Sequence, residues 1–88
     1  MKIKLHVTGI FCNGVAIEDS VLNFECECVT AKVVLEATVQ VLQKMHALFD
    51  EDGLILAVDG KVVVRSDLND VIISNEQVFS VFPPLFGG

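Results

Sequence analysis

Two glycines at the C-terminus, Gly87 and Gly88, are the residues whose type and position most directly suggest chemistry. A glycine has no side chain, so a diglycine end can pass through a narrow channel and adopt backbone angles closed to other residues. Pro83 and Pro84 come shortly before and favour an extended, polyproline-like chain that keeps the end clear of the folded body. We predict that residues 83–88 form a tail whose reactive group is the carboxylate of Gly88. An inert, disordered end is the alternative.

Three cysteines, Cys12, Cys26 and Cys28, form an odd set without the spacing of a disulfide framework or a zinc site. Cys26 and Cys28 continue an alternation that starts with Leu22 and Phe24, as on one face of a strand. We therefore expect both thiols to be reduced and to pack in the core as small hydrophobic side chains. Metal binding or redox chemistry is the alternative for this pair.

The two histidines, His6 and His46, have no His, Cys or carboxylate nearby at ligand spacing, so we expect ordinary surface or boundary residues and no metal site. The sequence has no phosphate-binding glycine loop, nucleophile elbow or zinc-protease motif. We expect no cofactor bound by this chain, and we do not expect it to be an enzyme by itself.

A chain of 88 residues is long enough for one domain with one hydrophobic core, and about half of its residues are apolar. We place the domain at residues 1–82 and the tail at residues 83–88. The apolar runs are far shorter than the ~20 residues of a membrane-spanning helix. Lysines alternate with apolar residues at the N-terminus, unlike the apolar stretch of a secretion signal. These features predict a cytoplasmic protein without a membrane partner.

Acidic residues outnumber basic residues by twelve to six, and the basic residues are scattered along the sequence. Nucleic-acid-binding domains concentrate Lys and Arg on one surface, so we do not expect a nucleic acid partner. A negative surface suits docking against a basic patch on a larger protein, although solubility alone also explains it.

Residues 3–8 alternate apolar and polar side chains, which predicts a first strand. Asn13 and Gly14 are a turn signal, and a polar stretch through Ser20 predicts a loop before alternation resumes in residues 22–28. These two strands would form a hairpin.

From Thr30, a predicted N-cap, the apolar period becomes helical, and the acidic residues with Gly53 in segment 50–53 predict its end. The expected buried stripe consists of Val34, Ala37, Val41, Leu42, Met45, Leu48 and Phe49.

Residues 54–58 and 61–65 predict two strands joined by a turn at Asp59 and Gly60. Segment 66–75 is expected to be irregular, and the last strand, containing Phe79 and Phe82, is halted by the two prolines. This order of elements predicts an α+β fold, a mixed sheet of four to five strands with one main helix packed on one face.

The order of elements, together with the ending Phe-Pro-Pro-Leu-Phe-Gly-Gly of residues 82–88, resembles the MoaD/ThiS family of sulfur carriers. The ending is similar to the aromatic-Pro-Pro-x-x-Gly-Gly terminus of the molybdopterin synthase small subunit branch. Residues 54–61 are similar to the middle hairpin of the family. The likeness extends over essentially the whole chain.

This resemblance implies a ubiquitin-like β-grasp fold and a carrier cycle. A ubiquitin-activating-type adenylyltransferase would adenylate Gly88 with ATP and magnesium, and a persulfide donor would convert the adenylate to a thiocarboxylate. The large subunit of molybdopterin synthase would then receive the tail. The residues expected to contact these partners are Phe82, Pro83, Pro84, Leu85 and Phe86. Open alternatives are a carrier for thiamine or another thio-metabolite, a protein modifier joined to lysines through Gly88, and a binding module with an inert tail.

Overall fold

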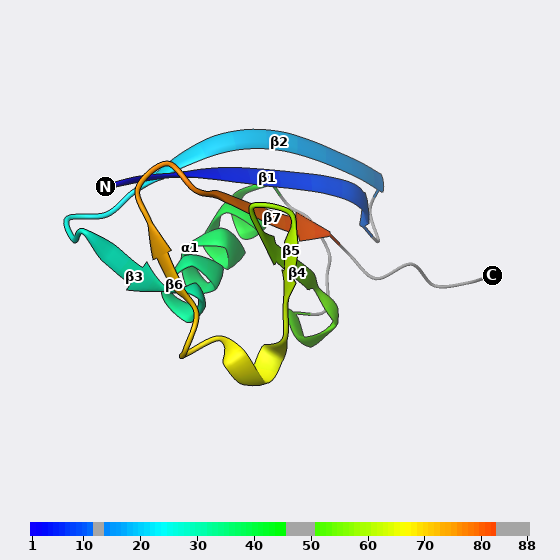
Figure 1. Ribbon diagram of the computed structural model, residues 1–88. Coiled ribbons are helices and arrows are strands. Elements are labelled where there is room, and N and C mark those ends of the chain that lie inside the picture. The colour runs from blue at the N-terminus through cyan, green and yellow to red at the C-terminus, as the bar shows by residue number, and fades with distance from the viewer. Residues whose placement is uncertain (12–13, 46–50, 83–88) are drawn as a thin grey trace.

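Seven strands and one α-helix make up the part of the chain that the computed structural model describes, residues 1–11, 14–45 and 51–82 (Figure 1). Two short 3-10 turns, Glu51–Gly53 and Arg65–Asp67, lie beside the strands that follow the helix. The strands and the helix are β1 (Lys2–Phe11), β2 (Gly14–Asn23), β3 (Cys28–Thr30), α1 (Ala31–Lys44), β4 (Ile55–Val58), β5 (Lys61–Val63), β6 (Ile72–Ser74) and β7 (Val78–Phe82).

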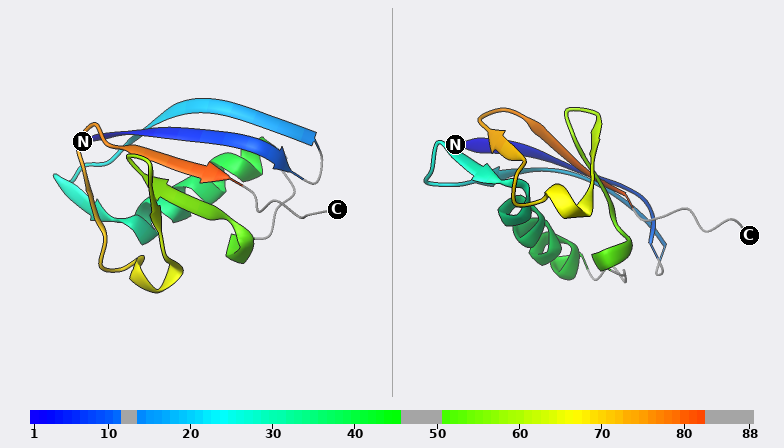
Figure 2. Two further views of the ribbon diagram at one scale, coloured as in Figure 1. Left: turned by 45° about the vertical axis from the view of Figure 1, so that its right-hand side comes forward. Right: turned by 60° about the horizontal axis from the view of Figure 1, so that its bottom comes forward.

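Five strands form one mixed sheet in the order β2-β1-β7-β4-β5. The central strand β7 runs parallel to β1 and antiparallel to β4, while β1–β2 and β4–β5 are antiparallel hairpins. Strands β3 and β6 form a separate antiparallel pair beside α1. Figure 2 shows α1 lying across one face of the large sheet. The predicted α+β architecture, with a mixed sheet and one main helix, is confirmed.

The hydrophobic core lies between α1 and the sheet. Alternate residues of β1 and β7 point toward the helix, because successive side chains of a strand face opposite sides. Phe79 is the largest of the fully buried side chains, and it comes from the central strand. The buried apolar residues are Ile3, Leu5, Val7, Ala31, Val34, Leu35, Leu42, Leu54, Leu56, Ala57, Ile73, Phe79 and Val81.

Helix α1 begins at the predicted N-cap, where the Thr30 hydroxyl accepts a hydrogen bond from the Val33 N–H at 3.4 Å. Its end was predicted wrongly, since it terminates at Lys44, before the acidic segment. In the described part of the chain, no helix combines the length and apolar character needed to cross a bilayer.

The helix also buries a partly different stripe from the predicted one, namely Ala31, Val34, Leu35, Thr38 and Leu42. The buried stripe depends on how α1 is rotated about its axis, and the start of the helix sets that rotation. The Ala31 N–H donates to the Val71 carbonyl at 2.9 Å and so fixes the first turn against the segment before β6. Thr38 is tolerated in the core because its hydroxyl donates to the Val34 carbonyl at 2.8 Å. Leu48 and Phe49 lie outside the described residues.

The predicted polar loop after the first strand is instead strand β2, which begins at Gly14 and pairs with β1 along its full length. An edge strand with one face in water accepts polar residues such as Asp19, so the alternation there is weak. β2 ends at Asn23, five residues before the predicted end of that strand.

The hairpin β4–β5 agrees with its prediction. Asp59 and Gly60 have φ values of 49° and 86°, as a two-residue turn with positive φ at both positions requires. β5 is shorter than predicted and ends at Val63. The segment predicted to be irregular contains β6, whose pairing with β3 depends on a partner more than forty residues earlier in the sequence.

Candidate functional site

Strand β7 leads directly into the predicted tail, and its last residue is Phe82. The predicted tail residues Pro83, Pro84, Leu85, Phe86, Gly87 and Gly88 lie outside the described residues. Their roles, and the boundary between a domain of residues 1–82 and a tail of residues 83–88, stay predictions. The site is therefore described from the strand that precedes the tail and from the surface around that strand.

The end of β7 is held on both sides. Val81 stands opposite Val7 of β1 and opposite Leu56 of β4, and all three side chains are buried. Two residues earlier, Phe79 is fully buried. A strand with backbone ladders on both edges and its side chains in the core has little freedom to shift. The point at which the chain continues beyond Phe82 is consequently fixed relative to the sheet.

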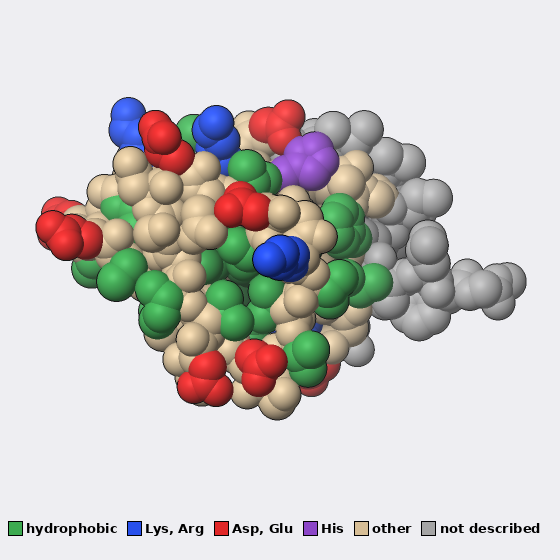
Figure 3. Space-filling view, in the orientation of Figure 1, with side chains coloured by type: hydrophobic (Ala, Val, Ile, Leu, Met, Phe, Trp, Pro, Cys, Tyr) green, Lys and Arg blue, Asp and Glu red, His purple; other side chains and the backbone are tan. Residues whose placement is uncertain are grey.

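An apolar patch consisting of Ile55, Val62 and Phe82 lies on the sheet face opposite α1. Ile55 stands opposite Phe82 in the β4–β7 register, and Ala57, two residues along β4, stands opposite Val62. Ile55 is 39% exposed, Val62 is 69% exposed and Phe82 is half-buried. Figure 3 shows hydrophobic side chains gathered over this region of β4, β5 and β7. Exposed apolar clusters of this kind commonly mark contact surfaces.

A shallow groove of about 570 Å³ lies on the same sheet face over β2, β1 and β7. His6, expected to be an ordinary surface residue, is half-buried there, and its Nδ1–H donates to Asp19 Oδ1. Their side chains are 40% and 78% exposed, so water screens the interaction between them. The pair could not be predicted from sequence, because the predicted loop hid the register that places Asp19 opposite His6. His46 lies outside the described residues.

The expected burial of Cys26 and Cys28 is wrong, because both are exposed free cysteines. β2 ends at Asn23, and the chain then bends over residues 25–27 instead of continuing as a strand. The alternation in this segment therefore does not correspond to a sheet face. Among residues 1–11, 14–45 and 51–82, no three or more His, Cys, Asp or Glu side chains gather where they could hold a metal ion. Cys12 is not among the described residues.

Asp59, in the β4–β5 turn, links that turn to the start of β7. Its Oδ1 accepts a hydrogen bond from the Val78 N–H at 2.9 Å, and its Oδ2 accepts one from Gln77 Nε2 at 3.0 Å. These two bonds favour the ionised carboxylate and lower the pKa of Asp59 below its ordinary value, and the bond from the Val78 backbone has the larger effect. From the sequence alone, Asp59 is predicted only as a turn residue.

Replacing Asp59 with Asn is expected to reduce the loss of stability in acid. A carboxyl group with a lowered folded-state pKa stabilises the fold above its unfolded pKa, about 3.9, and this stabilisation is lost as the pH falls through the folded pKa. Asn tolerates positive φ and keeps an acceptor for Val78, but it has no charge to lose. The free energy of unfolding, measured with urea from pH 7 to pH 2.5, should differ between the parent and D59N by an amount that decreases as the pH falls. A constant difference would contradict this role.

Comparison with known proteins shows the fold. A solved structure of the thiamine biosynthesis protein ThiS from Geobacter metallireducens superposes with a TM-score of 0.60, covering 97% of this chain and 99% of that chain, at 16% sequence identity. This likeness shows that the two chains share a β-grasp fold, as predicted. No protein-family model matches the sequence, and a search of curated proteins finds no match either.

Proposed function

We propose that this chain is a ubiquitin-like sulfur carrier whose working group is the C-terminal carboxylate of Gly88. The observation that carries the proposal is the position of the diglycine end, six residues after the central strand of a β-grasp sheet. The fold shared with a thiamine biosynthesis protein supports it. A fixed strand followed by a short tail free of bulky side chains at its tip suits delivery of a carboxylate into the active site of another protein.

The chemistry requires activation, because a carboxylate is a poor electrophile. A carboxylate oxygen of Gly88 attacks the α-phosphorus of ATP and displaces pyrophosphate, giving an acyl adenylate. A persulfide sulfur then attacks the acyl carbon and displaces AMP, and cleavage of the resulting sulfur–sulfur bond by a donor thiol leaves the thiocarboxylate. The adenylyltransferase supplies ATP, magnesium and the charge stabilisation. The carrier itself supplies only the tail and a surface for docking.

Two receiving pathways are supported by different observations. Phe82, Pro83 and Pro84 resemble the ending of the molybdopterin branch, which favours a role as the small subunit of molybdopterin synthase, with the large subunit as sulfur acceptor. The similar solved structure is a thiamine biosynthesis protein, which favours thiamine as the second candidate. We give priority to molybdopterin because the tail is the part that a synthase would contact.

Intact-mass measurement of the protein purified from its native host tests the carrier role. A carrier should show a fraction of molecules in which one oxygen is replaced by sulfur, located at Gly88 by fragmentation. Isopeptide conjugates to lysines of other proteins would instead indicate a modifier. Finding neither product, together with no ATP-dependent adenylation of Gly88 by the host adenylyltransferase, would remove the proposal.

Replacing Phe82 and Phe86 together with Ala is expected to weaken binding to the adenylyltransferase at least about tenfold, since buried aromatic anchors commonly dominate interface energies. Val33→Ala is the matched control, because Val33 is an exposed apolar residue (40%) on the helix, away from the patch. Isothermal titration calorimetry measures both variants. Equal affinity of the double variant and the parent would remove the docking role of these side chains.

A further inference from the structure

Two exposed thiols, separated only by Glu27, lie where the loop after β2 leads into β3: Cys26 is on the loop and Cys28 is the first residue of β3. Cysteine is among the residues most often buried, because it packs as a small hydrophobic side chain. Neither Cys26 nor Cys28 belongs to the core or to the half-buried residues packed against it. Core packing therefore does not explain why cysteines occupy these two positions, so we consider the reactivity of their thiols.

The spacing of the two cysteines in the sequence is compatible with a disulfide between them. A disulfide requires Cα atoms about 4.4 to 6.8 Å apart, whereas two fully extended residue steps span roughly 6.6 to 7.2 Å. The chain bends over residues 25–27, and regular strand pairing starts only at Cys28. A bent segment is shorter than a fully extended one, so the covalent geometry of a Cys-x-Cys segment permits a disulfide here.

Both ends of the loop are anchored. The Met1 ammonium donates to the Phe24 carbonyl at 2.8 Å, and the Phe24 N–H donates back to the Met1 carbonyl at 2.9 Å. At the other end, Cys28 stands opposite Ser74 in the β3–β6 register. Cys26 lies between these anchors, so the rearrangement that joins the two sulfur atoms would be confined to the segment between Phe24 and Cys28.

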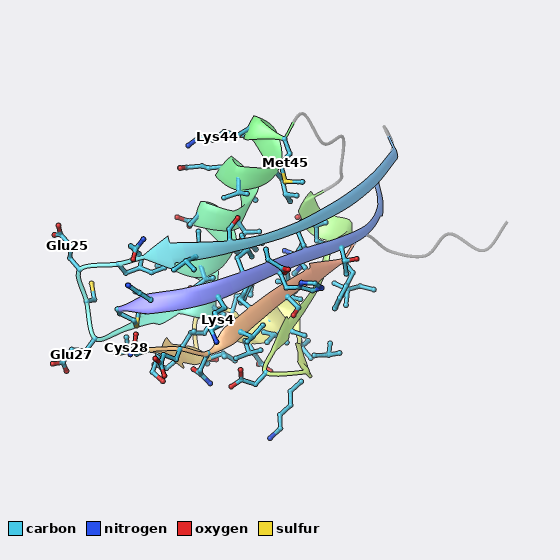
Figure 4. All side chains as sticks on the ribbon, turned by 90° about the horizontal axis from the view of Figure 1, so that it is seen from above. Lys4, Glu25, Glu27, Cys28, Lys44 and Met45 are labelled. Carbon is cyan, nitrogen blue, oxygen red and sulfur yellow. The ribbon has the colours of Figure 1, made fainter. Side chains whose placement is uncertain are left out.

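The loop is also accessible to small molecules. Cys26 lines a shallow cavity of about 380 Å³ together with Met1, Glu25, Glu27 and Asn75. Figure 4 shows Glu25 and Glu27 on the loop that projects beyond the strands, and Cys28 next to them where β3 begins. A low-molecular-weight disulfide can therefore approach this site without any change in the core.

We propose that Cys26 and Cys28 form a redox-active dithiol that exchanges electrons with low-molecular-weight disulfides such as glutathione disulfide. The thiolate of one cysteine attacks a sulfur of glutathione disulfide, whose sulfur–sulfur bond breaks, and the first glutathione leaves and takes up a proton. The second cysteine attacks the protein sulfur of this mixed disulfide and expels the second glutathione. Overall, two protein thiols lose two electrons and two protons, and one glutathione disulfide becomes two glutathione molecules. Exposed disulfides are readily reduced again by the reverse exchange.

A structural zinc site is a less suitable assignment for the pair. Such sites use four ligands, and in the described part of the chain no third His, Cys, Asp or Glu completes a metal-binding group here. A disulfide, in contrast, needs only two thiols, and Cys26 and Cys28 are separated by a single residue.

The dithiol lies at the end of the sheet opposite the one where β7 ends. Asn23, the last residue of β2, stands opposite Lys2, whereas the end of β7 stands beside Val7 of the same strand β1. Five residue steps along a strand span roughly 17 Å. The redox site is thus independent of the proposed carrier chemistry, and either can fail without the other.

Oxidation of the reduced full-length protein with excess glutathione disulfide tests the proposal, with acid quenching and peptide mass mapping at intervals. The parent and the control C12S are expected to form a Cys26–Cys28 disulfide, seen as the loss of two hydrogens from one peptide. C26S and C28S are expected to retain glutathione on the remaining cysteine of the pair, at a level at least about tenfold above that in the parent. The difference arises because the second step in the parent is intramolecular.

Accumulation of glutathione in the parent to the level seen in C26S and C28S would overturn the proposal, as would cross-linking of either cysteine to Cys12 or to a second chain. Binding of phenylarsine oxide, which joins two neighbouring thiols with release of water, gives a second measurement. One equivalent should remain bound to the parent and to C12S, and retention by C26S or C28S to the same extent would contradict the dithiol. Both cysteines are exposed, so the serine variants are expected to fold, which circular dichroism checks.

Discussion

Adding a single alanine after Gly88 is expected to abolish adenylation of the chain. The extra residue moves the terminal carboxylate by about 3.3 to 3.6 Å along an extended chain and places a side chain at the reacting end. Misplacement of a reacting group by about 1 Å can already cost on the order of 100-fold in rate. We therefore expect a loss of at least that size in pyrophosphate release with the host adenylyltransferase and ATP.

The folded body provides the control for this variant. The last described strand ends at Phe82, seven residues before the added alanine, so the midpoint of thermal unfolding should be the same as that of the parent. Gly88→Ala keeps the chain length and adds only a methyl group, which separates the effect of length from that of the side chain. Adenylation of the extended chain at the parental rate would show that the carboxylate of Gly88 is not the reacting group.

Phe79→Ala is expected to destabilise the protein by roughly 3 to 5 kcal/mol, the usual range for removing a buried phenylalanine side chain. Phe79 is fully buried on the central strand, where it stands opposite Leu5 of β1 and Val58 of β4. Domains of this size have total stabilities of about 5 to 15 kcal/mol, so the variant would lose a large share of its stability. Urea unfolding followed by circular dichroism measures the loss.

Phe82→Ala is the matched control for this experiment, because it removes the same side chain from the same strand at a half-buried position. We expect its effect on the free energy of unfolding to be less than half that of Phe79→Ala. If Phe79→Ala does not fold, Phe79→Leu and Phe82→Leu give the same comparison with a smaller loss of volume, and the change at the buried position is expected to cost more. Equal costs at the two positions would contradict the assignment of Phe79 to the core.

The sequence predicted the architecture well wherever a local signal determined it. Thr30 marked the helix start through its capping chemistry, and Asp59 with Gly60 marked the hairpin turn through their tolerance of positive φ. The alternation in β1 identified the residues that face the core. These features depend on neighbours within a few residues, so they can be read without knowing the rest of the fold.

Features that depend on distant partners could not be predicted in this way. β6 is a strand because β3 pairs with it, and the rotation of α1 is set by the bond from Ala31 to Val71. The polar residues of β2 concealed a full-length strand. Because the end of that strand was placed too late in the sequence, Cys26 and Cys28 were wrongly predicted to be buried. The candidate site at the two terminal glycines stays a prediction from the sequence, whereas the patch that flanks Phe82 required the pairing of β7 with β4.

The strand that joins the two halves of the large sheet is the last one to be synthesised. Before β7 is added, the hairpin β2–β1 and the hairpin β4–β5 have no common neighbour, since both border only the gap that β7 fills. A ribosome that stops before residue 78 would therefore release a polypeptide with two unpaired sheet edges, which proteases and chaperones recognise. Translation through Phe82 is thus a condition for folding, and the large sheet closes only when the last of its five strands has left the ribosome.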